Sequence, residues 1–255
     1  MSKITFEKPN YELQNVQFNC DENFGEHIKS PFPSTSFFWL LCGRAGSGKT
    51  SLMINALSMK GRNRVYRNIF DKILLVMPSN SRKSLKNNPL DDLPEEQMFE
   101  NMGDDVIDKV KEIRETFDEL DKKKKRSRRQ LLILDDITAY LKDNPKGLIE
   151  LATNRRHLKL SIILLVQFVR AVPRPVRFQI TTITFFKPSN ELDIKIIQEE
   201  FINLKKDVFD DLKRLVFESP HDFLMIDKNN EVYYKNLQKI NFSHHILNDD
   251  KSQEG

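Results

Sequence analysis

The sequence predicts an α/β protein built on a mostly parallel sheet that is flanked by helices. Two observations lead to this fold class. Short, continuous apolar runs recur along the chain, which is typical of strands buried on both faces of a sheet. Segments with apolar residues at helical spacing separate these runs, and strands that alternate with helices form parallel sheets through right-handed crossovers.

The apolar runs and the periodic segments give the order of the expected elements. The expected strands cover residues 37–42, 73–77, 131–134, 160–166 and 180–186. The expected helices cover residues 49–59, 104–122, 146–153, 191–204 and 208–216. Between the second strand and the long helix lies a loop-rich acidic stretch, in which Pro94 is expected to start a short helix.

We expect one core domain with an arm before it and an appendage after it. Residues 1–34 are mixed and polar and form the N-terminal arm, with one strand near residues 4–6. Residues 35–220 carry the alternating pattern of the core. Residues 221–255 are expected to form a β-hairpin around an Asn-Asn pair, followed by a polar tail.

Composition excludes several classes of protein. A chain of 255 residues buries enough apolar surface to fold without disulfides or structural metals. Its two cysteines, Cys20 and Cys42, form no CxxC pair, so we expect a reducing intracellular compartment and no zinc site. The longest apolar runs are too short to cross a bilayer and no signal-peptide pattern is found, so we expect no membrane association.

A phosphate-binding loop follows the first expected strand. Residues 43–50 match the pattern GxxxxGK[ST] in full, and an apolar-periodic helix comes next, which argues against an accidental match. The glycines allow backbone N–H groups to surround a phosphate at the positive end of that helix. Lys49 is expected to reach the β- and γ-phosphates of ATP, and Thr50 to bind Mg²⁺. The expected nucleotide-binding residues are Gly43, Arg44, Ala45, Gly46, Ser47, Gly48, Lys49 and Thr50.

Polar side chains end two further expected strands. Asp135 is expected to hold Mg²⁺, mostly through water, and Asp136 to polarise the water that attacks the γ-phosphate. The alternative for this pair is a helix N-cap. Gln167 ends the run 160–166, and its amide could donate to the γ-phosphate and accept from the water, although strand ends are often polar for other reasons.

Together these segments resemble the FtsK/HerA superfamily of DNA-pumping ATPases. The resemblance rests on the phosphate loop, the strand ending in the Asp pair, the segment Arg-His-Leu-Lys-Leu-Ser at 156–161 and the strand ending in Gln167. The Arg-His pair and the stretch from 175–177 to 184–187 look most like the genome-packaging ATPases of poxviruses, giant viruses and their smaller relatives. The resemblance covers about residues 30–240.

This resemblance implies a RecA-like P-loop fold of the ASCE type, in which the sensor strand lies between the phosphate-loop and carboxylate strands. It also implies a homo-hexameric or pentameric ring with ATP at the subunit interfaces. Arg156 is then the first candidate for an arginine finger that acts on a neighbour, and Arg177 is the second; a surface salt bridge is the alternative for both. Much of the superfamily carries Glu where this chain has Asp136, which places the carboxylate one methylene further back.

The function implied is ATP-driven movement of double-stranded DNA, with backbone contacts and no sequence reading, to package a viral genome into a preformed capsid. The implied setting is a virus-encoded protein in the host cytoplasm or viral factory, which meets a capsid or portal protein at a vertex. The alternatives are a helicase or conjugation-type pump on the same core, and a non-hydrolysing tether between DNA and capsid. The intact pair Asp135 and Asp136 argues against the tether, and the absence of an NKxD motif disfavours a GTPase.

Positive charge is concentrated in one segment of the chain. Residues 122–129 hold seven basic side chains among eight, so the remainder sums to −3 against a formal net charge of +4 (4 − 7 = −3). The chain is therefore not a uniformly basic protein. This segment could contact DNA phosphates in the pore of a ring, and the alternatives are a solvated loop or a nuclear-localisation-like patch.

Overall fold

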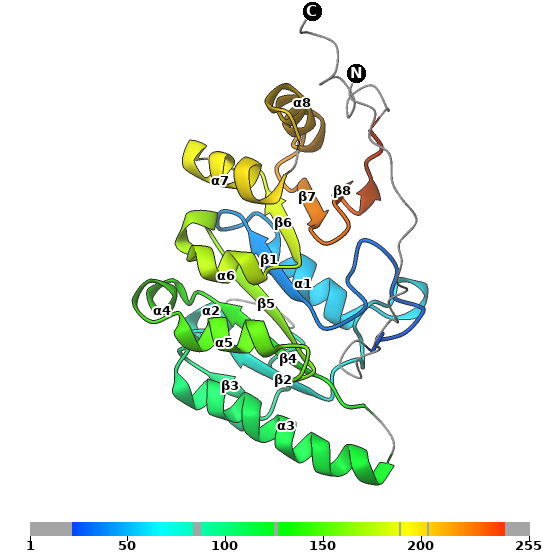
Figure 1. The fold of residues 1–255 in the computed structure, drawn as a ribbon, viewed down its shortest axis with the longest axis vertical. Helices are drawn as coiled ribbons and strands as arrows, with labels where there is room; N and C mark the ends of the chain where they lie inside the picture. Colours follow the sequence, from blue (N-terminus) through cyan, green and yellow to red (C-terminus); the bar gives the residue numbers. More distant parts are fainter. Residues whose placement is uncertain (1–21, 84–87, 125–126, 189, 203, 243–255) are drawn as a thin grey trace, which may run out of the picture.

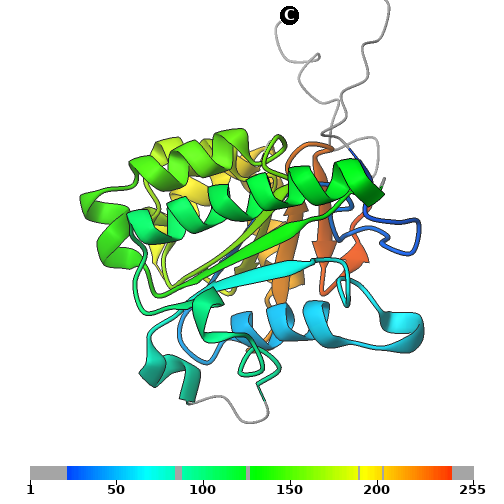
Figure 2. The ribbon, with the colours of Figure 1, turned by 90° about the horizontal axis from the view of Figure 1, so that it is seen from below.

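A nine-stranded sheet runs through the part of the chain that the structure, a computed structural model, describes: residues 22–83, 88–124, 127–188, 190–202 and 204–242. Helices cover both faces of this sheet (Figures 1 and 2). The expected strand near residues 4–6 and the polar tail after residue 242 lie outside the described residues. In the described part, no helix combines the length and apolar character that a bilayer span requires.

The strand order is β3-β2-β4-β5-β1-β6-β7-β8-β9. The strands are β1 (Phe38–Cys42), β2 (Lys72–Val76), β3 (Met98–Phe99), β4 (Gln130–Asp135), β5 (Leu160–Val166), β6 (Thr182–Phe186), β7 (Phe223–Asp227), β8 (Val232–Lys235) and β9 (Gln238–Lys239). The pairs from β3 to β6 are parallel and those from β6 to β9 are antiparallel. The mostly parallel sheet is therefore confirmed, and β5 lies between β1 and β4 as the resemblance implied.

Eight α-helices are found in the described residues. They are α1 (Lys49–Ser58), α2 (Ser79–Lys83), α3 (Asp104–Lys124), α4 (Thr138–Asp143), α5 (Lys146–Asn154), α6 (Arg174–Gln179), α7 (Glu191–Phe201) and α8 (Lys206–Val216). Three 3₁₀ turns cover Gly61–Asn63, Glu95–Gln97 and Val169–Ala171. All five helices expected from periodicity are present, whereas the short helices α2, α4 and α6 and the strands β3 and β9 were not predicted.

Alternation along the central strands divides the core into two layers. In β1, Phe38 and Leu40 face a cluster that includes the apolar faces of α3, α5, α7 and α8. Trp39 and Leu41 point to the opposite side, where α1 and the aromatic residues of segments 24–37 and 65–70 pack. Because both faces are covered, the central strands are apolar at nearly every position, with the buried Gln130 and Ser161 as exceptions, which explains their continuous runs.

The C-terminal hairpin is continuous with the core sheet. β7 pairs with β6 in antiparallel register from Phe186↔Phe223 to Thr182↔Asp227, and β8 pairs with β7. The start of β7 therefore lies at the same edge of the sheet as the end of β6. The expected hairpin is present as part of one sheet, while the division of the chain at residues 34 and 220 stays a prediction.

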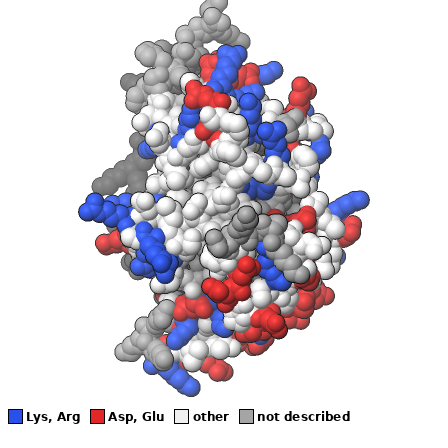
Figure 3. All heavy atoms as spheres, turned by 180° about the vertical axis from the view of Figure 1, so that it is seen from behind, with Lys and Arg blue, Asp and Glu red and all other residues white. Residues whose placement is uncertain are grey.

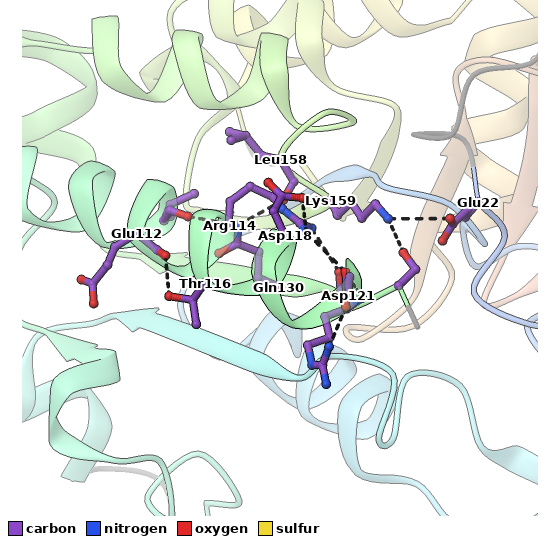
Figure 4. A network of polar contacts seen from close by, with 12 residues as sticks. Glu22, Glu112, Arg114, Thr116, Asp118, Asp121, Gln130, Leu158 and Lys159 are labelled. Carbon is purple, nitrogen blue, oxygen red and sulfur yellow. Dashed lines mark hydrogen bonds and ion pairs between the residues drawn. The ribbon is translucent and has the colours of Figure 1, made fainter. Parts of the chain in front are cut away.

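A buried ionic network fastens the end of α3 to the start of β4 (Figure 4). The Asp121 carboxylate lies 2.6 Å from the guanidinium of Arg128 and 3.4 Å from that of Arg114, and it accepts the backbone N–H of Arg128 at 3.0 Å. The two arginine side chains are only 11% and 7% exposed. Burial alone would raise the pKa of Asp121, but the bonds from Arg128 and Arg114 outweigh it and lower that pKa.

The last residues of the basic segment are thus engaged within the protein. Arg129 donates its backbone N–H to Asp71 and a guanidinium N–H to the carbonyl of Asn23, both at 3.1 Å. Arg128 and Arg129 are therefore structural cations just before β4, and they do not form a free basic surface patch. A role in DNA contact stays a prediction for the exposed Lys122 and Lys123, and residues 125 and 126 lie outside the described residues.

We predict that Asp121→Ala lowers the free energy of unfolding by about 3 kcal/mol, because it removes the carboxylate that pairs with the largely buried Arg128 and one of the two that pair with Arg114. Asp118→Ala is the matched control, since Asp118 also pairs with Arg114 (2.7 Å) but is 60% exposed, and its loss should cost less than about 1 kcal/mol. Urea unfolding of both variants measures the difference. Equal losses would contradict the assignment.

The pH dependence of this contribution follows from the lowered pKa of Asp121. A carboxyl group whose pKa is lower in the folded state stabilises the fold above the pKa of the unfolded chain. That contribution is lost as the pH falls through the folded pKa. The stability gap between wild type and Asp121→Ala should therefore narrow as the pH is lowered through this range.

Candidate active site

The carboxyl ends of three adjacent strands bring the predicted site residues together. Cys42 at the end of β1 pairs with Val166 of β5, and Leu165 of β5 pairs with Asp135 at the end of β4. The phosphate loop, the Asp pair and Gln167 therefore follow strands that end at the same level. They line one cavity of about 280 Å³, whose walls are Ala45, Gly46, Lys49, Thr50, Met77, Ser81, Asp135, Asp136, Thr138, Leu165, Val166 and Gln167.

The phosphate loop is closely packed and needs its glycines. Gly48, the residue before α1, has φ +110°, a conformation that L side chains rarely adopt. At Gly43, an added Cβ would lie 2.7 Å from both the Cβ of Phe186 and the Oγ of Ser47. The loop backbone thus lies directly against the end of β6, so a side chain at position 43 would push the loop out of place.

Lys49 is held inside this loop. Its Nζ donates hydrogen bonds to the carbonyls of Gly43 (2.5 Å) and Arg44 (3.1 Å). Partial burial lowers the pKa of Lys49, while the negative charge of Asp135 opposes that shift. The two charges are therefore close enough to influence each other, as an ATP site with the metal carboxylate beside the phosphate loop requires.

The Asp pair leaves β4 through an unusual backbone turn. Burial raises the pKa of Asp135, and Lys49 opposes the shift. Asp136 is exposed and has φ +57°, in the left-handed region that few residues other than glycine occupy. Successive side chains of a strand point to opposite faces; the turn at Asp136 breaks this alternation, so both carboxylates line the same cavity.

The donor set fits a magnesium ion. Mg²⁺ prefers hard oxygen ligands and keeps several of its waters, so one hydroxyl and one or two carboxylates suffice on the protein side. Thr50 and Asp135 supply such oxygens in the cavity, with Asp136 beside them. No group of three or more His, Cys, Asp or Glu side chains that could hold a metal ion by themselves is found among the described residues.

The two candidate arginines lie in different environments. Arg156 is exposed and lies before the first residue of β5, whereas Gln167 follows the last. Seven residues of strand separate the two edges by roughly 20 Å. Arg156 therefore lies far from the phosphate loop of its own chain, at a second cavity of about 590 Å³ on the amino edge of the sheet.

Arg177 is buried and paired. Its Nε and Nη2 both lie 2.7 Å from the carboxylate of Glu200, and its Nη1 donates to the carbonyl of Val172 at 2.5 Å. The bonds from Arg177 lower the pKa of Glu200. This geometry favours the salt-bridge alternative for Arg177, because a guanidinium fixed on three acceptors in the interior would have to abandon them to reach a neighbour.

Three aromatic residues beside the phosphate loop were not predicted from the sequence. The Nδ1 of His221 lies 3.2 Å from the carbonyl oxygen of Ser47, and Phe186 and Phe223 are nearby with ring centroids 5.4 Å apart. His221 comes from the turn before β7 and Phe223 is the first residue of β7, both far along the chain. Only the antiparallel pairing of β7 with β6 brings them to this edge, and no local pattern in the sequence indicates that pairing.

Comparison with known families identifies the chain. The family model described as Poxvirus A32 protein matches residues 28–240. The chain belongs to the Poxvirus A32 protein family. This finding confirms the resemblance to viral genome-packaging ATPases that the sequence motifs indicated, and with it the prediction that the chain is an ATPase. A comparison with curated proteins gives no match.

Solved structures support the same fold. The genome packaging NTPase B204 from Sulfolobus turreted icosahedral virus 2, in complex with sulfate, is 18% identical with a TM-score of 0.53, covering 82% of this chain and 99% of that one. Its complex with ATP-gammaS is 18% identical with a TM-score of 0.51, and the match covers 78% of this chain and 96% of that one. B204, the DNA-packaging ATPase from Sulfolobus Turreted Icosahedral Virus, is 16% identical with a TM-score of 0.50, and the match covers 80% of this chain and 98% of that one. At these identities the similarity demonstrates the fold alone, a mostly parallel sheet flanked by helices.

We predict that Asp135→Asn raises the Tm of the nucleotide-free protein at neutral pH. The raised pKa of Asp135 means that the fold disfavours the charged form of this carboxyl group. Removing the charge should therefore stabilise the fold, while it also removes the proposed metal ligand. A gain of about 1 kcal/mol corresponds to about 2–4 °C for a domain of this size. Differential scanning calorimetry measures the shift.

The pH dependence supplies the control. A carboxyl group whose pKa is higher in the folded state favours the fold at low pH, and this contribution is lost as the pH rises through the folded pKa. The Tm gap between Asp135→Asn and wild type should therefore grow as the pH rises through that range. A Tm at or below the wild-type value at neutral pH would contradict the prediction.

Proposed function

We propose that this ATPase moves double-stranded DNA into a preformed viral capsid, with Mg²⁺·ATP hydrolysed at the carboxyl edge of the sheet. The observation that carries the proposal is that the phosphate loop, the Asp pair and Gln167 line one cavity. A family model of packaging ATPases covers the same core. A phosphate cradle, a metal carboxylate, a base and a γ-phosphate sensor in one cavity are the components that ATP hydrolysis needs.

Each residue has a distinct part in this mechanism. Thr50 and Asp135 would hold Mg²⁺, which neutralises phosphate charge when it is bound. Lys49 stabilises negative charge on the β- and γ-phosphate oxygens, and the partial burial that lowers its pKa also strengthens its electrostatic effect. Asp136, exposed in the same cavity, accepts the proton of the attacking water. Gln167 donates to the γ-phosphate and orients that water.

The segment after Gln167 offers a route from hydrolysis to movement. The turn Val169–Ala171 follows the sensor directly, and the backbone N–H of Arg170 donates to the buried carboxylate of Asp193 in α7 at 3.0 Å. A change in the position of Gln167 on loss of the γ-phosphate would therefore pull on α7. We propose that α7 and α8 pass this displacement to the loops that contact DNA.

The placement of Arg156 supports a head-to-tail ring. A finger at the amino edge of one copy can serve a nucleotide at the carboxyl edge of the next, which is a heterologous interface that closes into a ring. We propose a hexamer or pentamer in which Arg156 completes the neighbour's site. Arg155, beside it, has its pKa lowered by burial and by the charge of Arg156, so positive charge is concentrated at this edge.

DNA would be held through its backbone without sequence reading, because a motor must release every step. The face seen in Figure 3 carries charges of both signs, with acidic side chains gathered in its lower part, so this face does not supply a broad basic surface. The exposed Lys122, Lys123 and Arg170 are the proposed phosphate contacts. The proposal places the ring at a capsid vertex in the viral factory, docked on a capsid or portal protein.

We predict that duplex DNA stimulates phosphate release by the wild-type chain and that Lys49→Ala nearly abolishes this release. The ammonium is expected to supply transition-state stabilisation at the β- and γ-phosphate oxygens. Lys60→Ala is the matched control, since Lys60 is an exposed lysine just beyond α1. This variant should hydrolyse ATP at the wild-type rate. Phosphate release is measured with and without DNA. Absence of turnover in the wild type would sink the motor mechanism.

A mixing experiment tests the proposed interface. Arg156→Ala alone should lower turnover by about 10³–10⁵ while its Tm stays near wild type, because the residue is exposed. Arg156→Ala mixed with an equal amount of Asp136→Ala should recover part of the activity, since about a quarter of random neighbour pairs combine an intact base with an intact arginine. Arg177→Ala should instead lower the Tm, because it leaves Glu200 without its partner. No recovery in the mixture would rule out Arg156 as the finger.

A further inference from the structure

A third cavity opens on the other side of the phosphate loop. It measures about 610 Å³, and its walls come from residues 46–50 of the loop, from the first turns of α1, and from Phe186, His221 and Phe223. It shares Gly46, Lys49 and Thr50 with the cavity that holds the Asp pair. The first cavity lies toward β5 and β4, whereas this one lies toward β6 and β7.

Three aromatic rings form the wall that faces α1. Phe186 ends β6 and is 3% exposed, and its ring centroid lies 5.4 Å from that of Phe223 at the start of β7. His221 is attached to the loop itself, with Nδ1 3.2 Å from the carbonyl oxygen of Ser47. A Cβ on Gly48 would lie 3.3 Å from the ring of Phe186 and 3.9 Å from the ring of His221. The wall therefore begins where α1 begins.

The direction of the nucleotide follows from the two cavities. If the γ-phosphate lies beside Asp135 and Gln167, the triphosphate runs along the loop and its α-phosphate reaches the backbone N–H groups at the start of α1. The nucleoside must then leave the loop on the side away from the carboxylates. That side is the aromatic cavity, which is large enough for a purine nucleoside.

We infer that this cavity is the nucleoside site of the ATPase, and that the ring of His221, in the same wall as Phe223, is the surface on which the base packs. The inference rests on the proposed function of the first cavity. Flat aromatic rings hold bases by stacking without needing a particular hydrogen-bond pattern. The hydrogen bond to Ser47 fixes the imidazole at the loop, so the base and the phosphates would be bound by parts that move together.

A different role for His221 has to be separated from this one. Through its bond to Ser47, His221 could act only on the shape of the phosphate loop. In that case its loss would weaken every ligand that has a phosphate chain. If His221 packs on the base, its loss weakens only ligands that have a base.

The experiment compares two ligands on the full chain by calorimetry: AMPPCP, which has a base and is not hydrolysed, and inorganic tripolyphosphate, which has none. For His221→Ala we expect the Kd of AMPPCP to rise about 5- to 10-fold, the lower range for loss of one aromatic surface under a base, while that of tripolyphosphate changes less than about 2-fold. His221→Phe keeps a ring but loses the bond to Ser47, and it should bind AMPPCP close to wild type.

His27→Ala is the matched control, because the exposed His27 makes an equivalent contact with a backbone carbonyl, Nε2 to Val65 O at 3.2 Å, far from the loop. It should leave both Kd values unchanged. Equal weakening of both ligands by His221→Ala, or no change for AMPPCP, would overturn the nucleoside site.

Lys49→Ala separates this failure from failure of the proposed function. If the phosphate loop is the part that binds the triphosphate, Lys49→Ala should lose affinity for both AMPPCP and tripolyphosphate. If it does so while His221→Ala has no selective effect, only the nucleoside site is wrong. A wild-type chain that binds neither ligand would overturn both proposals.

Discussion

The proposed active site depends on one electrostatic relation, that between the partly buried Lys49 and Asp135. The lysine belongs to the loop after β1 and the aspartate to the end of β4, and β5 lies between these strands. Their charges act on each other across that strand: each opposes the pKa shift that burial imposes on the other. The parallel register that aligns Cys42 with Val166 and Leu165 with Asp135 keeps the two groups at one level. A slip of one strand would separate them.

Much of this arrangement could be predicted from the sequence because its signals are local. Strands buried on both faces are apolar at most positions, so β1, β4 and β5 are visible as nearly continuous apolar runs. The residues that follow such runs are the ones that reach the carboxyl edge of a parallel sheet. The Asp pair and Gln167 were found in this way and the phosphate loop from its GxxxxGK[ST] motif, and the structure brings all of them to one cavity.

The features that were missed depend on contacts between distant segments. The helix α6 contains Pro175 at its start and has only six residues, so it shows no periodicity. Arg177 looks like any surface arginine in the sequence, and only the packing of α6 against α7 supplies Glu200. Likewise, His221 reaches the phosphate loop because β7 adds to the sheet in antiparallel direction. Such pairings are set by the tertiary fold and leave no local pattern.

Strand β5 is buried at all seven positions and pairs in parallel with β1 on one side and β4 on the other. Because parallel neighbours are hydrogen-bonded to it on both sides, this strand cannot bend independently of the sheet. Gln167, the proposed γ-phosphate sensor, follows one end of this strand, and the loop with Arg156 precedes the other end. A displacement at one end of the strand would therefore be transmitted to the other end. In a closed ring, each copy could in this way report its nucleotide state to the next copy, and firing could pass in one direction around the circle.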